Sequence, residues 1–298
     1  MKSSLFEKKC RVLITALLLT ASCGPVEEDT SSPPLAQLKQ AALTNNGLSF
    51  NGLSFNGLSF NGLTTSSFHT WFQSAPQLAN VVMRYIVRCA VPAGQSRSYT
   101  SPSGQQYVWT GELGLAPVWA SGLAASVYEQ QVVSACLAAH TNRLGEEVSI
   151  SILGRDAAGQ AIPYTQAELA SHSRRESCFF GNIFTGESLF VGAEREPLGS
   201  SESTSRACGP LLNNGNESRV PCAPMKYVGA CASLCTLDSS GHFFTSCTYN
   251  GVTYHRPLTT RLRVEDVHKC GDSRCQATEQ CGTSSRYDNC ALDCGPCP

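Results

Sequence analysis

The sequence predicts an α+β fold: one disulfide-rich body with antiparallel hairpins, followed by a small cysteine-rich C-terminal module. Three observations predict it. Apolar residues fall at helical spacing in the first half of the body, hairpin signals gather in the second half, and the cysteines after Cys23 come in even groups. Because the expected helices are segregated from the expected hairpins, rather than alternating with parallel strands, the class is α+β.

Residues 1–22 predict a secretion signal. The stretch has a basic start, an apolar run over residues 12–19 that only Thr15 interrupts, and small residues before the expected cleavage site. A short transmembrane anchor is the alternative, but the run is well below the about 20 apolar residues that span a bilayer.

The phrase "LLLTASCG" resembles the lipobox of bacterial lipoproteins. The resemblance implies that Cys23 is acylated and becomes the mature N-terminus, and acyl chains would then hold the protein on a membrane. Thr20 stands where the family usually has an aliphatic residue, so an ordinary signal peptide cut nearby is the alternative. Gly24 in place of Asp implies the outer membrane by the enterobacterial sorting pattern. We therefore expect a lipid-anchored protein of the cell envelope.

Residues 23–67 predict a tether that carries the repeat "NGLSFNGLSFNGLSFNGL". A period of five gives no apolar stripe on a helix and sends successive units to opposite faces of a strand. The Leu-Ser pair resembles the pentapeptide-repeat solenoids, but four units would make about one coil, too few to bury a core. A chain of Asn-Gly turns is favoured, flexible or loosely docked, whose Leu and Phe side chains a partner or the body itself covers.

The body is expected over residues 68–268, and its first half predicts helices. In "SAPQLANVVMRYIVRCA" the apolar residues have helical spacing and deliver Cys89 to the core. A hairpin is expected around residues 101–104. The next stretch, from Glu112 onward, predicts one long or two short helices that carry Cys136 and end near Gly145.

Strands are expected in the rest of the body. "EEVSISILG" alternates, with Val148, Ile150 and Ile152 on one face. Thr165 and Glu168 have capping-box spacing for a short helix. "HFFTSCTYNGVTYHRP" has the Asn-Gly signal of a hairpin between two β-favouring runs, and "TTRLRV" predicts one more strand.

The cysteines predict disulfides, about four in the body and three in the module at residues 269–298. Even counts in an exported protein favour this interpretation over free or metal-binding thiols. The candidates are Cys89, Cys136, Cys178, Cys208, Cys222, Cys231, Cys235, Cys247, Cys270, Cys275, Cys281, Cys290, Cys294 and Cys297. Cys231 and Cys235 could instead be redox-active, although the reactive spacing is usually Cys-x-x-Cys.

The phrases "WTGELGLAPVW", "VSACLAAHTNRLG" and "CFFGNIF" resemble stretches of uncharacterised, cysteine-rich myxobacterial lipoproteins that also carry Asn-Gly-Leu repeats. The resemblance covers most of the body. It implies location and class and brings no activity with it.

Charge and motifs exclude several functions. Without the signal, 18 Lys and Arg stand against 22 Asp and Glu, so no nucleic-acid partner is expected. The Gly-x-Ser-x-Gly, His-Glu-x-x-His, phosphate-loop and dinucleotide signatures are absent from the sequence, and the catalytic residues, if any, are unknown. Two weaker sets of candidate functional residues remain. For each set, ordinary packing in the core or exposure on the surface is the favoured alternative. The sets are His140, His172, His242 and His255 paired with Asp156, Glu168 or Glu176, and a sugar-binding groove of Trp71, Trp109 and Trp119.

The module "CGDSRCQATEQCGTSSRYDNCALDCGPCP" resembles short cysteine-rich modules at the ends of secreted bacterial proteins, with Ser273 and Asn289 as departures. Its oxygen-bearing side chains make calcium the one candidate cofactor, since calcium takes six to eight oxygen ligands. A disulfide knot with solvated acids is the alternative. The candidate ligands are Asp272, Glu279, Asp288 and Asp293, with Asn289 beside them.

These observations favour a lipid-anchored envelope protein with a binding or structural role over an enzyme. The expected partners are the membrane, through the N-terminal lipid, and an envelope polymer or surface protein. The alternative is a secreted or surface hydrolase that acts on cell-wall or other extracellular polymers. A third interpretation makes the body a carrier for its C-terminal module.

Overall fold

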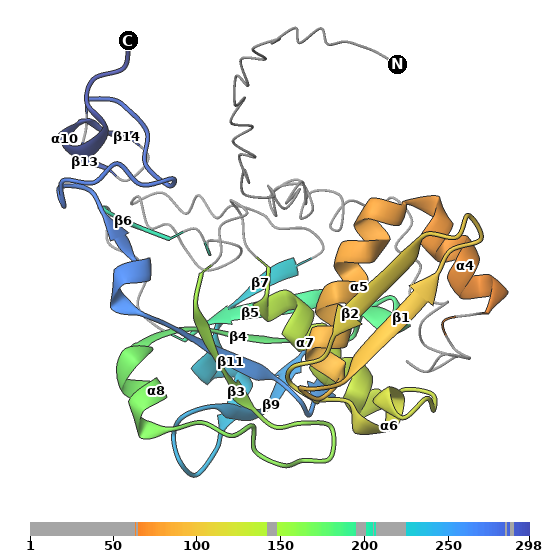
Figure 1. The fold of residues 1–298 in the computed structure, drawn as a ribbon. Coiled ribbons are helices and arrows are strands. Elements are labelled where there is room, and N and C mark those ends of the chain that lie inside the picture. The colour runs from red at the N-terminus through yellow and green to blue at the C-terminus, as the bar shows by residue number, and fades with distance from the viewer. Residues whose placement is uncertain are drawn as a thin grey trace, which may run out of the picture. The chain divides into compact units, whose positions relative to one another are not determined.

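The computed structural model describes residues 63, 65–141, 148–194, 201–204, 206, 225–283, 285–286 and 289–298. All of these fall in one unit, Pro33–Pro298. The predicted signal, Cys23 and the repeat up to Gly62 lie outside the described residues. The fold is α+β, as the sequence predicts (Figure 1).

A five-stranded mixed sheet forms the centre of the body. Its strand order is β3 (Ile150–Gly154), β11 (Leu258–Leu262), β4 (Arg174–Gly181), β5 (Leu189–Ala193) and β7 (Met225–Ala230). All neighbours are antiparallel except β5 and β7, which pair in parallel. The parallel pair was not expected from the hairpin signals. Every residue of β5 and β11 is buried, because both faces of the sheet are covered.

One face of the sheet packs on helices (Figure 1). Helix α7 (Val127–Ala139) lies against β4, β5 and β11, and helix α5 (Pro76–Ala90) lies against α7. Phe179 and Val191 point from the sheet into this main core, which also holds Met83, Ile86 and Val133. The disulfide between Cys89 and Cys136 joins α5 to α7, so the predicted helix does deliver Cys89 inward.

The opposite face carries a smaller sheet, with the order β10 (Val252–Tyr254), β9 (Phe244–Tyr249) and β8 (Cys235–Leu237). Phe180 and Phe190 from the central sheet pack there against Phe244 and Tyr254. Asn250 and Gly251 both have positive φ, 50° and 80°, which is the turn that the Asn-Gly signal predicts. Helix α9 (Cys231–Leu234) precedes β8.

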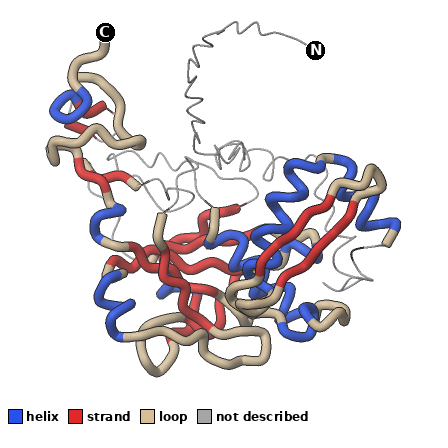
Figure 2. Tube along the Cα trace, viewed as in Figure 1, coloured by secondary structure: helices blue, strands red, loops and turns tan. Residues whose placement is uncertain are grey.

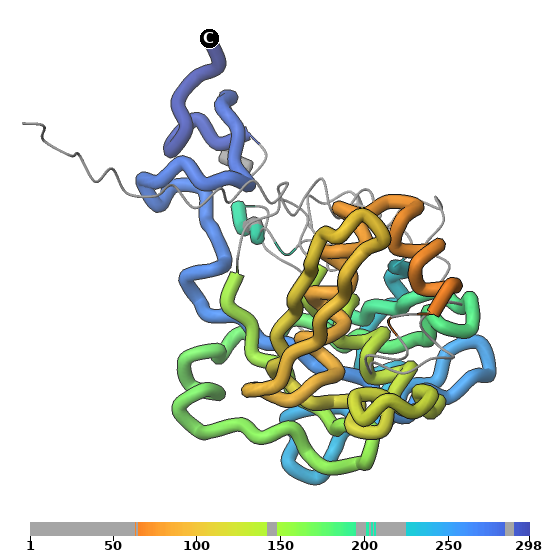
Figure 3. The backbone as a smooth tube through the Cα atoms, turned by 45° about the vertical axis from the view of Figure 1, so that its right-hand side comes forward, coloured from red at the N-terminus to blue at the C-terminus, as the bar shows by residue number. Residues whose placement is uncertain are grey.

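The body begins earlier than expected. Helix α4 (Ser66–Ser74), capped by the Thr65 side chain, contains the boundary that the sequence placed after residue 67. Leu63, from the last Asn-Gly-Leu unit, is 1% exposed and belongs to the main core. The hairpin of β1 (Ser96–Thr100) and β2 (Gln106–Thr110) is the predicted one, and β2 lies against α5 (Figure 3).

The stretch after Glu112 forms two helices, α6 (Pro117–Ala120) and α7. Helix α7 ends at Ala139, short of the end near Gly145 that the sequence predicts. The backbone and hydroxyl of Thr141 donate to the carbonyls of Ala138 and Leu137, which closes the last turn. Residues 142–147 lie outside the described part of the chain.

The other predicted elements are present (Figure 2). In β3, Ile152 faces the main core, whereas Leu153 packs on the other face with Leu169 and Phe243. Val148 precedes the strand. Thr165 caps helix α8 (Gln166–Ser171), but the Glu168 carboxylate accepts from Ser151 rather than completing a capping box. The remaining short elements are η1 (Ile183–Thr185), β6 (Glu202–Ser203), η2 (Val264–Asp266) and β12 (His268–Lys269), with β12 paired to β6.

Six disulfides join described cysteines. In the body they are Cys89–Cys136, Cys178–Cys231 and Cys235–Cys247. In the module they are Cys270–Cys290, Cys275–Cys294 and Cys281–Cys297, so the first three cysteines pair in order with the last three. This module also holds β13 (Ser285–Arg286), β14 (Asn289–Cys290) and α10 (Ala291–Cys294). Cys208 and Cys222 lie outside the described residues.

Candidate functional site

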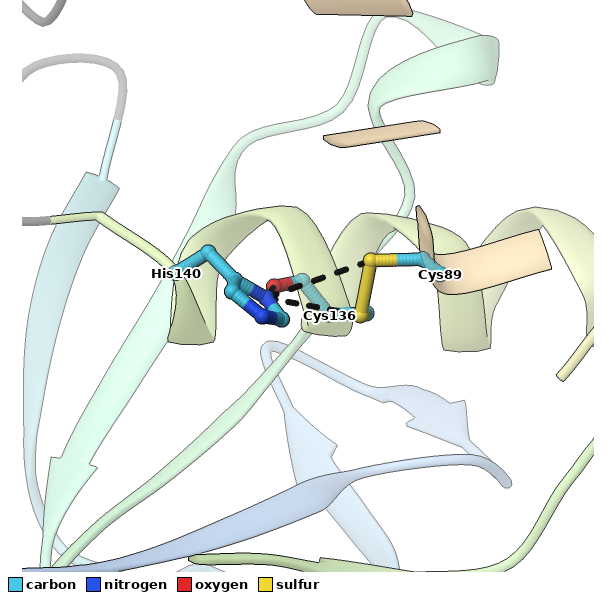
Figure 4. Close-up of side chains that lie close together, drawn as sticks. All are labelled: Cys89, Cys136 and His140. Atoms are coloured by element: carbon cyan, nitrogen blue, oxygen red, sulfur yellow. Dashed lines mark hydrogen bonds between the residues drawn. A yellow bond between two sulfur atoms is a disulfide. The ribbon is translucent and has the colours of Figure 1, made fainter. Parts of the chain in front are cut away.

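His140 lies beside a disulfide instead of a carboxylate (Figure 4). Its Nδ1 is 2.9 Å from the Cys136 carbonyl oxygen and 3.6 Å from the Cys136 sulfur. Although the residue is partly exposed, burial of the imidazole lowers its pKa to about 4. The ring is therefore neutral near pH 7 and packs near Tyr85, at 5.5 Å between centroids.

The other three histidines also find partners other than the candidate carboxylates. His172 Nε2 lies 3.0 Å from the Ser149 hydroxyl, His242 packs edge-on against Tyr164, and His255 packs edge-on against Tyr128.

The candidate carboxylates are engaged in structural contacts. Glu176 forms a buried ion pair with Arg206, Glu168 accepts from Ser151, and Asp156 accepts from the Gln160 amide. Among the described residues no hydrogen bond joins one of the four histidines to one of these three acids. The hydrolase alternative therefore gains no support from the residues that the sequence offered for it.

The three tryptophans are core residues. Trp71, Trp109 and Trp119 are 7%, 2% and 0% exposed, and the Trp109 indole donates to the Asn80 side chain at 2.7 Å. Trp119 packs edge-on against Phe184. A sugar-binding groove would need their faces exposed, so the packing interpretation is confirmed.

Acidic side chains of the C-terminal module mostly accept hydrogen bonds from backbone amides of the module itself. The Asp293 carboxylate accepts from the amides of Gly271, Asp272 and Ser273 at 2.6 to 3.2 Å. Asp272 accepts from the Arg274 amide, and Glu279 from the Gln276 amide. Asp288 lies outside the described residues. In the described part of the module, Asp272, Glu279 and Asp293 do not bring an oxygen each within 4.8 Å of one another.

Three groups of side chains of the types that bind metal ions occur among the described residues, but each contains a disulfide. They are Cys89–Cys136 with His140, Cys235–Cys247 with Cys178, and Cys270–Cys290 with Asp293. Since a thiolate is the metal-binding form of cysteine, these oxidised groups do not act as metal sites. Cys231 and Cys235 pair with different partners, Cys178 and Cys247, so the redox-pair alternative is wrong.

One surface of the body exposes apolar side chains together. Val118, Leu123, Val127 and Tyr128 are 45%, 63%, 58% and 44% exposed. Val118 comes from α6, Leu123 from the α6–α7 connection, and Val127 and Tyr128 from the first turn of α7; we call the four the 118–128 surface. Residues 113–128 contain no charged side chain. The other exposed large apolar residues, such as Val264 and Leu292, stand on separate elements.

Glu129 holds the 118–128 surface in shape from beneath. Its side chain is buried, and its two oxygens accept from the amides of Val118, Trp119 and Ser126 at 2.7 to 2.9 Å. The Ser126 hydroxyl accepts from the Glu129 amide, which completes a capping box at the start of α7. One carboxylate thus ties the first turns of α6 and α7 together.

The residues of the 118–128 surface alternate with residues of the same segment that are buried in the core. Trp119, Ala120 and Ala125 of the same segment are buried. Arg256 lies over the Tyr128 ring, with 4.5 Å from Cζ to the ring centroid, at the edge of the surface. The capping-box spacing of Ser126 and Glu129, and the absence of charge over residues 113–128, are the two sequence signals that could have revealed this surface.

Within the described part of the chain, the helices are too short or too polar to span a bilayer. Neither a protein-family model nor a curated protein nor a solved structure matches the chain significantly.

Proposed function

We propose that the protein is a lipid-anchored binding protein of the cell envelope, held by an acylated Cys23, whose 118–128 surface binds an uncharged, Leu- and Phe-bearing segment of a neighbouring protein. The observation that carries the proposal is the cluster of four exposed apolar side chains on a segment without charge. Clustered exposed apolar residues commonly mark interaction sites.

The chemistry of the surface favours a protein over a polysaccharide. Sugar-binding sites present aromatic faces with polar groups around them, whereas here the tryptophans are buried and the exposed side chains are mainly aliphatic. The segment that forms the surface has no charged side chain of its own, and Arg256 is the charged group that lies at its edge. An apolar segment of protein would bury Val118, Leu123 and Val127 without leaving a charge unpaired.

The repeat of residues 45–60 in a neighbouring copy of this chain fits that description. Its units carry Leu48, Leu53 and Leu58 with Phe50, Phe55 and Phe60, and no charge. The body already covers the leucine of the last unit, since Leu63 is 1% exposed within the main core. Copies anchored on one membrane would meet at a high effective concentration, which makes even weak contacts productive.

A labelled peptide, NGLSFNGLSFNGL, tests the partner. It would be titrated into the chain lacking residues 45–60, so that no internal repeat competes, and followed by fluorescence anisotropy. We expect a Kd of about 10–100 µM, because only a few apolar side chains become buried. Leu123→Ser and Tyr128→Ser should each weaken binding about tenfold, whereas Val264→Ser, at an equally exposed site on η2, should not. Equal binding by all variants would contradict the proposal.

Membrane fractionation and intact mass test the anchor separately. The native chain should carry acyl mass and sediment with membranes, and Cys23→Ala should be released. A native chain that lacks acyl mass would contradict the lipid anchor. It would not affect the conclusion from peptide binding about the 118–128 surface.

A further inference from the structure

A row of charged side chains crosses the central sheet on the face opposite α7. Arg261 on β11 pairs in register with Arg175 on β4 and with Ser151 on β3. Glu194 follows β5 directly, and its carboxylate lies 2.9 Å from Arg175 Nη1. Two arginines thus stand side by side on neighbouring strands, an arrangement that destabilises a sheet unless an anion balances it.

Glu194 is close enough to act on the charge of Arg261, but no hydrogen bond joins the two side chains among the described residues. Arg261 is 7% exposed, and its buried Nε has no hydrogen-bond partner among the described residues. Burial, and then repulsion from Arg175, lowers its pKa. A buried guanidinium without an acceptor is costly and therefore uncommon.

Glu194 does not supply the missing acceptor. Its side chain is 3% exposed, and neither oxygen accepts a hydrogen bond in the described structure, because the close approach of Arg175 is not aligned as one. Burial raises the pKa of Glu194 to about 7, although Arg175 and Arg261 oppose the rise. The carboxyl group therefore takes up a proton at a much higher pH than an ordinary glutamate, and once protonated it gives the two arginines no counter-charge.

Solvent reaches the row through Arg175. Its side chain is 37% exposed, and its Nη2 donates to the carbonyl of Gly241 in the loop between β8 and β9. The same loop carries His242, whose Nδ1 is buried without a partner and whose ring packs against Tyr164. Arg155 lies over the neighbouring Phe243 ring. The unpaired nitrogens of Arg261 and His242 therefore belong to elements next to the partly exposed Arg175.

We propose that Arg175 and Arg261 form a binding site for the carboxylate group of a small ligand, with the guanidinium of Arg261, whose Nε is unpaired, as its inner contact. A guanidinium and a carboxylate match in a planar, two-point geometry. The site is distinct from the 118–128 surface, so its ligand need not be the partner proposed above.

Protonation of Glu194 should be coupled to binding. The charged and titratable groups around the row are Arg175, Arg261, Tyr164 and His242, with Glu168 beyond Ser151. Loss of the Glu194 charge leaves both arginines free for an external anion. Acetate should therefore bind more tightly at pH 6 than at pH 8, and Glu194→Gln should remove most of that difference.

Acetate titration of the full mature chain with its disulfides intact, followed by NMR at both pH values, tests the site. We expect Arg261→Met and Arg175→Met to weaken acetate binding at least about tenfold, and Arg263→Gln, a nearby exposed arginine paired with Asp266, to leave it unchanged. Arg261→Lys keeps the charge without the two-point geometry and should also weaken it.

The melting temperature separates this site from a structural role. Without ligand, Arg261→Met should melt at or above the wild-type temperature, because it removes a buried guanidinium whose Nε has no acceptor. A clearly lower melting temperature combined with unchanged acetate binding would overturn the proposal. So would wild-type protein that binds no acetate at either pH, or that binds inorganic phosphate but not acetate.

Discussion

The 118–128 surface and the Arg175–Arg261 row depart from the usual distribution of residues in opposite directions. The first exposes aliphatic side chains that normally lie inside, and the second buries charged side chains that normally lie outside. Their local support also differs. Beneath the first, both carboxylate oxygens of Glu129 are hydrogen-bonded, whereas in the second the Arg261 Nε and both carboxylate oxygens of Glu194 have no hydrogen bond among the described residues.

This difference separates binding from stability. Exposed apolar side chains make few contacts in the free protein, so changing them should alter binding and hardly alter folding. A buried charge without an acceptor costs stability in the free protein, so changing it should alter both. The comparison therefore predicts which variants change the free energy of unfolding and which change binding alone.

The largest effect is expected beneath the 118–128 surface. Glu129→Ala removes the acceptor of three backbone amides, of which those of Val118 and Trp119 begin α6. Since a hydrogen bond to a charged group contributes about 1.5–3 kcal/mol and the three are not additive, we expect a loss of about 3–5 kcal/mol in the free energy of unfolding. Urea denaturation would measure it. Glu129→Gln keeps an acceptor and should lose less; equal losses would show that the carboxylate itself is not what holds the segment.

A smaller effect is expected at Glu194, and it depends on pH. Its pKa is raised from 4.5 to about 7 in the folded state. The folded protein then binds the proton more tightly than the unfolded chain, so this stabilisation is present below about pH 4.5 and is lost as the pH rises through about 7. The loss amounts to at most about 3 kcal/mol.

Glu194→Gln isolates that pH dependence. His140, with its pKa lowered to about 4, acts in the opposite sense, because its stabilisation is lost as the pH falls from 6.5 towards 4. Since His140 is present in both proteins, the difference between wild type and Glu194→Gln, measured by urea denaturation from pH 4.5 to 8, reports Glu194 alone. A difference that stays constant over this range would refute the buried-carboxyl interpretation.

The smallest effect on stability is expected at the exposed apolar positions. Leu123→Ser and Tyr128→Ser should each change the free energy of unfolding by less than about 0.5 kcal/mol, as is usual for surface substitutions. The same urea measurement applies. Burying a leucine side chain contributes about 1.5–3 kcal/mol. A loss of about 2 kcal/mol or more at Leu123 would therefore mean that its side chain is part of the core.

Local patterns predicted most of the fold. The spacing of apolar residues located α5, and Asn250-Gly251 located the β9–β10 hairpin, because both depend on neighbours in the sequence. The parallel pairing of β5 with β7 was not predicted, since it joins strands separated by a long connection. The end of α7 at Ala139 involves a hydrogen bond from the Thr141 side chain, which the spacing of apolar residues does not predict.

The candidate sites were less predictable. The histidines and tryptophans drew attention by their chemistry, yet Trp119 and His140 are occupied by packing. The 118–128 surface consists of ordinary aliphatic residues, and only the fold reveals that Leu123 faces outward while Trp119 faces inward. Likewise, Arg261 is unremarkable in sequence until strand pairing places it beside Arg175.

A photo-crosslinking amino acid in place of Leu123, in the acylated chain on native membranes, tests the central claim most directly. Mass spectrometry would identify the residues that it captures, and the same group in place of Val264 would serve as the control. The account predicts crosslinks from position 123 to residues 45–60 of another copy, and none to them from position 264. Crosslinks from position 123 to lipid alone, or to the repeat equally from both positions, would contradict it.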